Sequence, residues 1–291
     1  MWIIGKEQFK ITAILKNEYF YSGGCFETQK QPASVQSTKS NNKGENKMSL
    51  DIYLMRHGKT IANEQGLVQG WSDSPLTEEG IAGVVKSAQR FADAGIKFDA
   101  AFCSTSPRTK TTAQLVLQTT NQPDLRIQEI EDLREYNFGS FEQTHRDELH
   151  QLLAEKNGFA KVEDWIHAYR NGSLHRLAQT LARIDPTRKA EGESEFLARL
   201  NSVMFEIIGL SPRKGRILVV SHGMAITGIL KNIDPMSTLY ESVPNASMTR
   251  LSYSLSEGWK IHSIGDGGLR GSQGRPSLLE ASRAKRMGHI Y

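Results

Sequence analysis

The stretch Ile52-Tyr-Leu-Met-Arg-His-Gly-Lys-Thr60 decides the fold, because it joins an apolar run directly to an abrupt polar turn. Residues 52–55 are long enough for a strand that is buried on both faces. Arg56, His57 and Gly58 follow at once, where open α/β sheets place their ligand crevice. This pattern suggests an anion clamp, a nucleophile and a sharp turn. The alternative is a strand that ends in ordinary polar surface.

Composition describes an ordinary soluble chain. Of 291 residues, 38% are hydrophobic and 23% charged, which allows one large domain or two small ones. No apolar run approaches the roughly 20 residues of a membrane-spanning helix, and the first residues lack the apolar core of a secretory signal. Cys25 and Cys103 cannot build a disulfide framework or a zinc cage by themselves. We therefore expect a cytoplasmic protein without a membrane partner.

The net charge of +4 is concentrated at the two ends of the chain. Residues 1–47 carry seven Lys and four Glu, residues 267–291 carry five basic residues and one Glu, and the centre is therefore −3. This distribution does not favour a nucleic-acid partner. The polar composition of 1–47 predicts a loosely ordered extension, and that of 267–291 a loose basic tail. The catalytic domain is expected at 48–266.

Periodicity along this central part alternates between strands and helices. We predict a helix from Thr77 to Gly95, a strand at 98–104, an edge strand at 125–130 and a final hairpin at 248–264. Residues 141–195 are expected to contain a mostly helical lid, followed by an amphipathic helix. The loop after Gly58 is expected to run to Pro75.

Ser106-Pro107-Arg108 is expected to open a helix, with Ser106 as its cap. A cation is normally disfavoured in the first turn of a helix. Arg108 just beyond a strand therefore suggests an anion bound by its side chain and the helix amides. A surface arginine that tolerates the helix dipole is the alternative.

The sequence Arg216-Ile-Leu-Val-Val-Ser-His-Gly223 repeats the opening design of a strand followed by His-Gly. In a parallel sheet with right-handed crossovers, these strand ends share one edge. Two arginines and two histidines would then converge on a crevice suited to a phosphate dianion. Positive neighbours should keep His57 neutral and able to attack phosphorus. Glu135 is the candidate acid that protonates the leaving oxygen.

Five motifs together resemble the histidine phosphatase (phosphoglycerate mutase-like) superfamily. They are Arg56-His-Gly-Lys-Thr-Ile-Ala-Asn63, Ser104-Thr-Ser-Pro-Arg108 with Thr112-Ala113, Leu133-Arg-Glu-Tyr-Asn-Phe-Gly139, Gly192-Glu-Ser194 and Ser221-His-Gly223. The resemblance implies a three-layer α/β/α sandwich with a mostly parallel sheet and a helical lid. It implies that His57 is phosphorylated and that Arg56, Arg108 and His222 hold the phosphoryl group.

The same resemblance suggests Glu135 as proton donor. It places the substrate-binding residues at Thr60, Asn63, Gln69, Gly70 and Gly223. It implies no metal and no cofactor. Glu135-Tyr-Asn-Phe-Gly139 and Val68-Gln-Gly70 look like the phosphatase branch, whereas similar mutases carry Glu-Arg-His-Tyr-Gly at the acid loop. One departure is Glu142-Gln143, where such phosphatases usually read Glu-Gly.

Three functions are compatible with this pattern. The first is a phosphomonoester hydrolase that acts on a small phosphorylated metabolite through phosphohistidine. The second is a phosphoglycerate mutase, and the third is a catalytically silent phospho-ligand-binding module, against which the retained Glu135 speaks. The lid histidines are expected to be solvated or interhelical: His145, His150, His167 and His175. The lid arginines are expected on a salt-bridged helix face, and the alternative is that they bind a second anionic group: Arg146, Arg170 and Arg176. The substrate is left open, and so is a homodimer.

Overall fold

The computed structural model describes residues 48–236 and 238–265. The predicted extension at 1–47 and the predicted tail at 267–291 lie outside these residues. In chain order the elements are β1 (Ser49–Arg56), α1 (Ile61–Glu64), α2 (Glu78–Asp93), β2 (Ala100–Ser104), α3 (Pro107–Thr119), β3 (Ile127–Ile130), α4 (Arg146–Lys156), α5 (Val162–Arg170), α6 (Arg176–Ile184), α7 (Glu193–Leu210), β4 (Lys214–Ser221), α8 (Gly223–Ile233), β5 (Met248–Ser254) and β6 (Gly258–Ser263). Two short 3₁₀ turns lie at Glu131–Leu133 and Gly139–Phe141.

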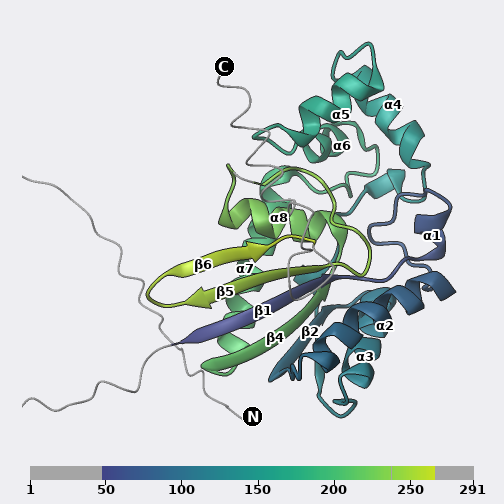
Figure 1. Cartoon of the computed structure of the whole chain (residues 1–291). Coiled ribbons are helices and arrows are strands. Elements are labelled where there is room, and N and C mark those ends of the chain that lie inside the picture. Colours follow the sequence, from purple (N-terminus) through teal and green to yellow (C-terminus); the bar gives the residue numbers. More distant parts are fainter. Residues whose placement is uncertain (1–47, 237, 266–291) are drawn as a thin grey trace, which may run out of the picture. The chain divides into compact units, whose positions relative to one another are not determined.

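The strands form one six-stranded sheet in the order β3-β2-β4-β1-β5-β6 (Figure 1). The first four in this order are mutually parallel, and β5 and β6 are an antiparallel hairpin added beside β1. The predicted edge strand and the final hairpin are therefore present, although the edge strand is shorter than predicted. The mostly parallel α/β sandwich is confirmed.

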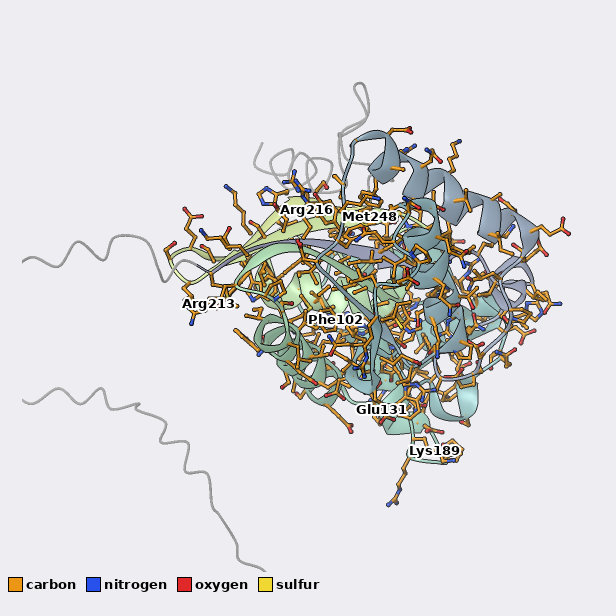
Figure 2. All side chains as sticks on the ribbon, turned by 90° about the horizontal axis from the view of Figure 1, so that it is seen from below. Phe102, Glu131, Lys189, Arg213, Arg216 and Met248 are labelled. Atoms are coloured by element: carbon orange, nitrogen blue, oxygen red, sulfur yellow. The ribbon has the colours of Figure 1, made fainter. Side chains whose placement is uncertain are left out.

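The two faces of the sheet pack against different helices, as the alternation of side chains along a strand requires. Ile52 and Leu54 of β1 join the apolar cluster of α7, α8 and the lid helices. Tyr53 and Met55 join the cluster formed with α2 and α3. Residues 52–55 are at most 3% exposed, so the central strand is buried on both faces. Figure 2 shows Phe102 of β2 inside the structure, whereas Lys189 projects away from it.

One expectation about a loop is wrong, and one about a helix cap is confirmed in its position alone. The segment from Gly58 to Pro75 contains the short helix α1, because Thr60 caps it by accepting from the Asn63 amide while the Asn63 side chain accepts from the Thr60 amide. Ser106 occupies the N-cap position of α3 as predicted, but its side chain makes no capping bond to the helix amides; its hydroxyl accepts from the Ser104 hydroxyl at 3.3 Å. Thr77 does cap α2, by accepting from the Gly80 amide.

Helix α2 begins tightly against the polar turn that follows β1. A Cβ on Gly80 would lie 2.1 Å from the carbonyl oxygen of Lys59, and one on Gly58 would lie 2.9 Å from the carbonyl oxygen of Gly80. Because neither glycine has a Cβ, the turn at His57 can lie directly against the first turn of the helix. No helix among the described residues is both long and apolar enough to cross a bilayer.

We predict opposite effects for two alanine substitutions in α2. Gly80→Ala should lower the free energy of unfolding by about 1–3 kcal/mol, because its methyl group overlaps backbone atoms that cannot move aside. Gly83→Ala is the matched control: its new Cβ would meet only the Ala246 Cβ, at 3.8 Å. It should stabilise the protein by roughly 0.5–1 kcal/mol, since alanine is the better helix former. Urea unfolding measures both, and equal effects would contradict this packing.

Candidate active site

The sheet brings three of the predicted strand ends together. In the register of the parallel strands, Arg56 of β1 lies beside Ser221 of β4. The His57 amide donates to the Ser221 carbonyl oxygen at 3.0 Å, which places both histidines at the same edge. The ring centroids of His57 and His222 are 5.3 Å apart. Ser104, which ends β2, completes the row, and its hydroxyl bonds the Nε2 of His222 at 2.9 Å.

Arg108 reaches this edge from the first turn of α3, and its side chain is fully buried. Its Nη2 lies 3.0 Å from Nδ1 of His222 and donates to the Gly70 carbonyl oxygen at 2.7 Å. Its Nη1 donates to the Ser72 carbonyl oxygen at 2.9 Å and to Asp73 Oδ1 at 2.7 Å. The guanidinium is thus fixed between the loop at 70–73 and the second histidine.

Hydrogen bonding determines the tautomer of His57. Its Nδ1 lies 2.8 Å from the carbonyl oxygen of Gly58, which can only accept, so Nδ1 carries the proton. Nε2 is left with its lone pair. Burial, and then the charges of Arg108 and Arg56, hold the pKa of His57 well below its ordinary value of 6.5. The ring is therefore neutral at pH 7, as the sequence led us to expect.

His222 has the opposite tautomer. Because Arg108 can only donate, Nδ1 of His222 accepts, and its Nε2 proton goes to the Ser104 hydroxyl. The ring is completely buried. Burial, then Arg108, His57 and Arg56, lower the pKa of His222 well below 6.5.

The two arginines keep unused donors. Arg56 Nη1 donates to the Val243 carbonyl oxygen at 2.6 Å, but Nε of Arg56 and Nε of Arg108 are both buried without a partner. Burial, and the charge of Arg108, lower the pKa of Arg56 to about 10, against an opposing effect of Glu135. Both groups remain cations at pH 7. Buried N–H groups without a partner are costly, and an anion bound between them would satisfy that need.

Glu135 lies on the loop that follows the 3₁₀ turn at Glu131–Leu133, and its buried carboxyl contacts the first amides of α8 close to these cations. Its Oε2 accepts from the Met224 amide at 2.9 Å, and its Oε1 from the Ala225 amide at 2.8 Å and the Tyr136 amide at 2.9 Å. Burial raises the pKa of the carboxyl, while these amides and the arginines oppose the rise; the net direction is upward. The protonated form therefore persists to a higher pH than for an ordinary glutamate.

Three of the five predicted substrate-binding residues form a hydrogen-bonded group, and the two glycines lie against the arginines of the site. Thr60, Gln69 and Asn63 form one connected group, in which the Thr60 hydroxyl donates to Gln69 Oε1 at 2.8 Å and the Thr60 amide to Asn63 Oδ1 at 3.3 Å. Gly70 serves Arg108 through its carbonyl oxygen, and its Cβ position is filled by the Tyr136 carbonyl oxygen, 2.1 Å away. Gly223 opens α8, where a Cβ would lie 3.2 Å from Cζ of Arg56.

Several residues that hold this site together were missed from the sequence. Asn245 Nδ2 donates to the His57 carbonyl oxygen and to Asn63 Oδ1, both at 3.1 Å. Glu142 accepts from the consecutive amides of residues 70, 71 and 72, at 3.0, 2.8 and 3.2 Å, so it shapes the loop that Arg108 contacts. The next residue, Gln143, has φ +64°, a conformation that favours glycine. This explains the glycine expected there.

The lid histidines differ in their surroundings. His145 and His167 are exposed, and His150 accepts from Trp165 Nε1 at 3.2 Å. His175 is 1% exposed and packs among aromatic rings, so it is interhelical rather than solvated. Burial lowers its pKa to about 3.

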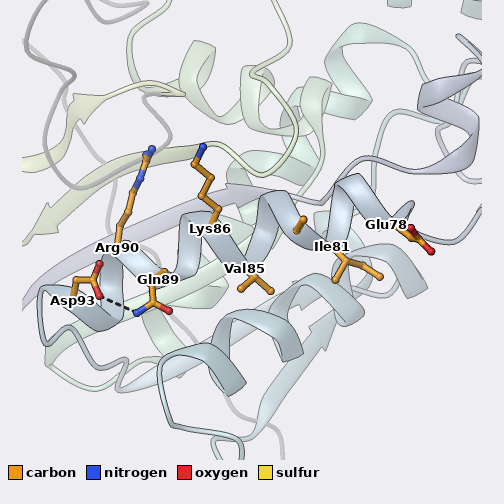
Figure 3. Close-up of a pocket in the computed structure, with 8 residues that line it drawn as sticks. Glu78, Ile81, Val85, Lys86, Gln89, Arg90 and Asp93 are labelled. Carbon is orange, nitrogen blue, oxygen red and sulfur yellow. Dashed lines mark hydrogen bonds between the residues drawn. The ribbon is translucent and has the colours of Figure 1, made fainter.

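Outside this site, the described residues form a surface hollow but no cluster of metal ligands. Within residues 48–236 and 238–265, no group of three His, Cys, Asp or Glu is arranged to hold a metal ion. A hollow on the surface is lined entirely by α2, with Ile81, Val85 and Gln89 in one row and Lys86 and Arg90 on its other side (Figure 3). None of these residues belongs to the predicted site.

Comparisons with known proteins identify relatives of this arrangement. A model of the histidine phosphatase superfamily (branch 1) matches residues 52–267. A probable phosphoglycerate mutase GpmB from Shigella dysenteriae is 30% identical over 226 residues, which is 75% of this chain and 93% of the relative.

Solved structures of similar fold include two enzymes with different names. A phosphoglycerate mutase from Bacillus anthracis has a TM-score of 0.68 and 31% identity, over 75% of this chain and 94% of its own. An α-ribazole phosphatase from Shigella flexneri has a TM-score of 0.57 and 22% identity, over 76% of this chain and 98% of its own. At that lower identity the second likeness concerns the fold alone.

We predict that His57 stays neutral and Nδ1-protonated as the pH falls from 7.5 to 6, because burial and two guanidiniums disfavour the imidazolium. Nitrogen chemical shifts of the histidine rings measure both properties. Arg108→Ala should raise the pKa of His57, whereas Arg90→Ala, a matched change on the exposed face of α2, should leave it unchanged. A wild-type His57 that titrates at or above 6.5, or that carries its proton on Nε2, would contradict the assigned geometry.

Proposed function

Because the chain belongs to the histidine phosphatase superfamily, we propose that it hydrolyses phosphate monoesters of small metabolites through a phosphohistidine on His57. One observation carries the proposal. A neutral imidazole with its lone pair on Nε2 lies among two cations, the partly buried Arg56 and the buried Arg108, that each retain a buried Nε–H without a partner. A nucleophile that must approach a phosphate dianion needs this combination of neutrality and surrounding positive charge.

The substrate phosphoryl group would bind between the two guanidiniums and His222. The Nε–H groups of Arg56 and Arg108 are buried without a hydrogen-bond partner, so they are the donors proposed for the phosphoryl oxygens. The amino end of α8, which begins at Gly223, adds the positive end of a helix dipole. Asn63 and Gln69 are proposed to contact the substrate from α1 and the loop that follows it.

In the first step, Nε2 of His57 attacks phosphorus and forms the P–N bond while the P–O ester bond breaks. Glu135 in its protonated form gives its proton to the leaving alkoxide, which departs as an alcohol. The Nδ1 proton of His57 stays on its bond to Gly58, which stabilises the cationic ring of the intermediate.

In the second step, water attacks the phosphohistidine and the P–N bond breaks. Glu135, now a carboxylate, accepts a proton from this water, so inorganic phosphate leaves and both the neutral imidazole and the protonated acid are restored. The raised pKa of Glu135 suits it to both tasks, since the group exchanges its proton more easily near neutral pH.

A second candidate is a phosphoglycerate mutase, and the names of the relatives at 30% and 31% identity favour it. A mutase uses the same phosphohistidine but returns the phosphoryl group to the substrate before water intervenes. The sequence Glu135-Tyr-Asn-Phe-Gly139 supports the hydrolase instead, because it lacks the Glu-Arg-His-Tyr-Gly pattern of the mutases.

We predict that His57→Ala reduces turnover of p-nitrophenyl phosphate by roughly a thousandfold or more. The neighbouring neutral imidazole, His222, cannot replace it, because its Nδ1 lone pair accepts from Arg108 and its Nε2 proton goes to Ser104. Release of p-nitrophenolate measures the rate. His262→Ala, an exposed histidine on β6, is the matched control and should keep the wild-type rate. A His57 variant that retains near-normal turnover would remove the covalent role.

The same preparation separates hydrolase from mutase. Incubation of the wild-type enzyme with 3-phosphoglycerate and a 2,3-bisphosphoglycerate primer should release inorganic phosphate without accumulating 2-phosphoglycerate. Rapid formation of 2-phosphoglycerate with little phosphate release would establish the mutase instead.

A further inference from the structure

We propose that the ion pair of Arg199 and Glu191 positions the acid Glu135 by holding the backbone on both sides of it. The proposal rests on the proposed function, in which Glu135 protonates the leaving group. Residues 132–137 are called the acid loop below. Apart from the last two residues of a 3₁₀ turn at Glu131–Leu133, this loop has no regular secondary structure, so it has no ladder of its own to fix its carbonyl groups.

Arg199 uses every donor of its guanidinium on this task. Its Nη1 donates to the carbonyl oxygens of Asp132 at 2.9 Å and Arg134 at 2.8 Å, and its Nη2 to that of Glu135 at 2.9 Å. The remaining two N–H groups grip Glu191, Nε at 2.5 Å and Nη2 at 2.7 Å. One planar fork therefore fixes three carbonyl groups of the acid loop, and a lysine could not reproduce that geometry.

Glu191 completes the grip on the other side of the acid. Its Oε2 accepts from the Asn137 amide at 2.8 Å. Its carbonyl oxygen accepts from the Tyr136 hydroxyl at 2.7 Å, and its amide donates to the Asn137 carbonyl oxygen at 3.2 Å. Glu135 is thus flanked by bonds from the pair on both sides of its own peptide unit.

The pair is rigid because of where it sits. Arg199 lies on α7, between the fully buried core residues Phe196 and Leu200, and its guanidinium stacks over the Phe196 ring at 4.9 Å. The side chains of Arg199 and Glu191 are 14% and 9% exposed. Trp71 Nε1 also donates to the Glu135 carbonyl oxygen, at 3.0 Å, so the same atom is fixed from two directions. Neither member of the ion pair contacts the phosphate-binding arginines in any described hydrogen bond.

This placement predicts that a change in the ion pair affects the proton donor but not phosphate binding. The anion pocket comes from the strand ends and α3, whereas the acid comes from a loop anchored on α7 (Figure 1). Loosening the anchor should displace the proton donor and leave phosphate binding intact. A proton donor matters for a leaving group of high pKa and hardly matters for one that departs as a stable anion.

The test is Arg199→Lys, measured as kcat/KM on phenyl phosphate and on p-nitrophenyl phosphate, two substrates of nearly equal shape. Displacement of the acid should lower kcat/KM for phenyl phosphate about tenfold or more. The value for p-nitrophenyl phosphate should stay within about threefold of the wild-type value. Inhibition by inorganic phosphate should be unchanged. Arg250→Lys, the same substitution at an exposed ion pair on β5, should leave both substrates and the inhibition at wild-type values.

Glu135→Gln separates a failure of the acid role of Glu135 from a failure of the positioning role of Arg199. It should show the same preferential loss on phenyl phosphate; without that loss, the acid role in the proposed function fails. If Glu135→Gln shows it and Arg199→Lys does not, or if Arg199→Lys weakens both substrates and phosphate inhibition equally, the positioning role is overturned. Should Arg199→Lys fail to fold, Glu191→Gln, which keeps the size of the side chain, decides by the same ratio of rates.

Discussion

The placement of two cations at one edge of the sheet, the partly buried Arg56 and the buried Arg108, is the constraint on which the rest of the site depends. Two like charges removed from water are costly, and each lowers the other's preference for its charged form. The chain offsets this cost with three carbonyl oxygens from two loops and with the carboxylates of Asp73 and Glu135. The compensation is incomplete, because the Nε–H of each arginine is buried without a hydrogen-bond partner. The site is therefore built for an anion to complete it.

Burial and the neighbouring positive charges together set the protonation states in the site. Burial, and then the charges of Arg108 and Arg56, hold the two histidines neutral, so that one can act as a nucleophile and the other as a hydrogen-bonding partner of Arg108. Glu135 accepts three backbone amides yet is buried deeply enough that its pKa still rises. A neutral nucleophile and a carboxyl group with a raised pKa can therefore coexist at one edge of the sheet.

Much of this arrangement could be predicted from the sequence, because strand ends and helix starts carry local signals. An apolar run followed by Arg56-His57, and a second followed by His222, fix both the strands and the edge where they meet. The anchors of the loops could not be predicted in this way. Asn245, Glu142 and Arg199 are common polar residues that act on backbone groups far away in the chain, so neither spacing nor periodicity identifies them. Ser106 occupies the predicted N-cap position of α3, but the sequence did not show that its side chain would bond Ser104 rather than the helix amides.

The most direct measurement of the central claim is the chemical identity of the phosphorylated enzyme during turnover. Wild-type protein mixed with labelled p-nitrophenyl phosphate can be quenched in alkali within milliseconds, digested and mapped by mass spectrometry. The account predicts a phosphoryl group that is labile in acid, stable in alkali and located on the peptide carrying His57. Phosphate on any other residue, or steady turnover without a phosphorylated enzyme at any quench time, would contradict it.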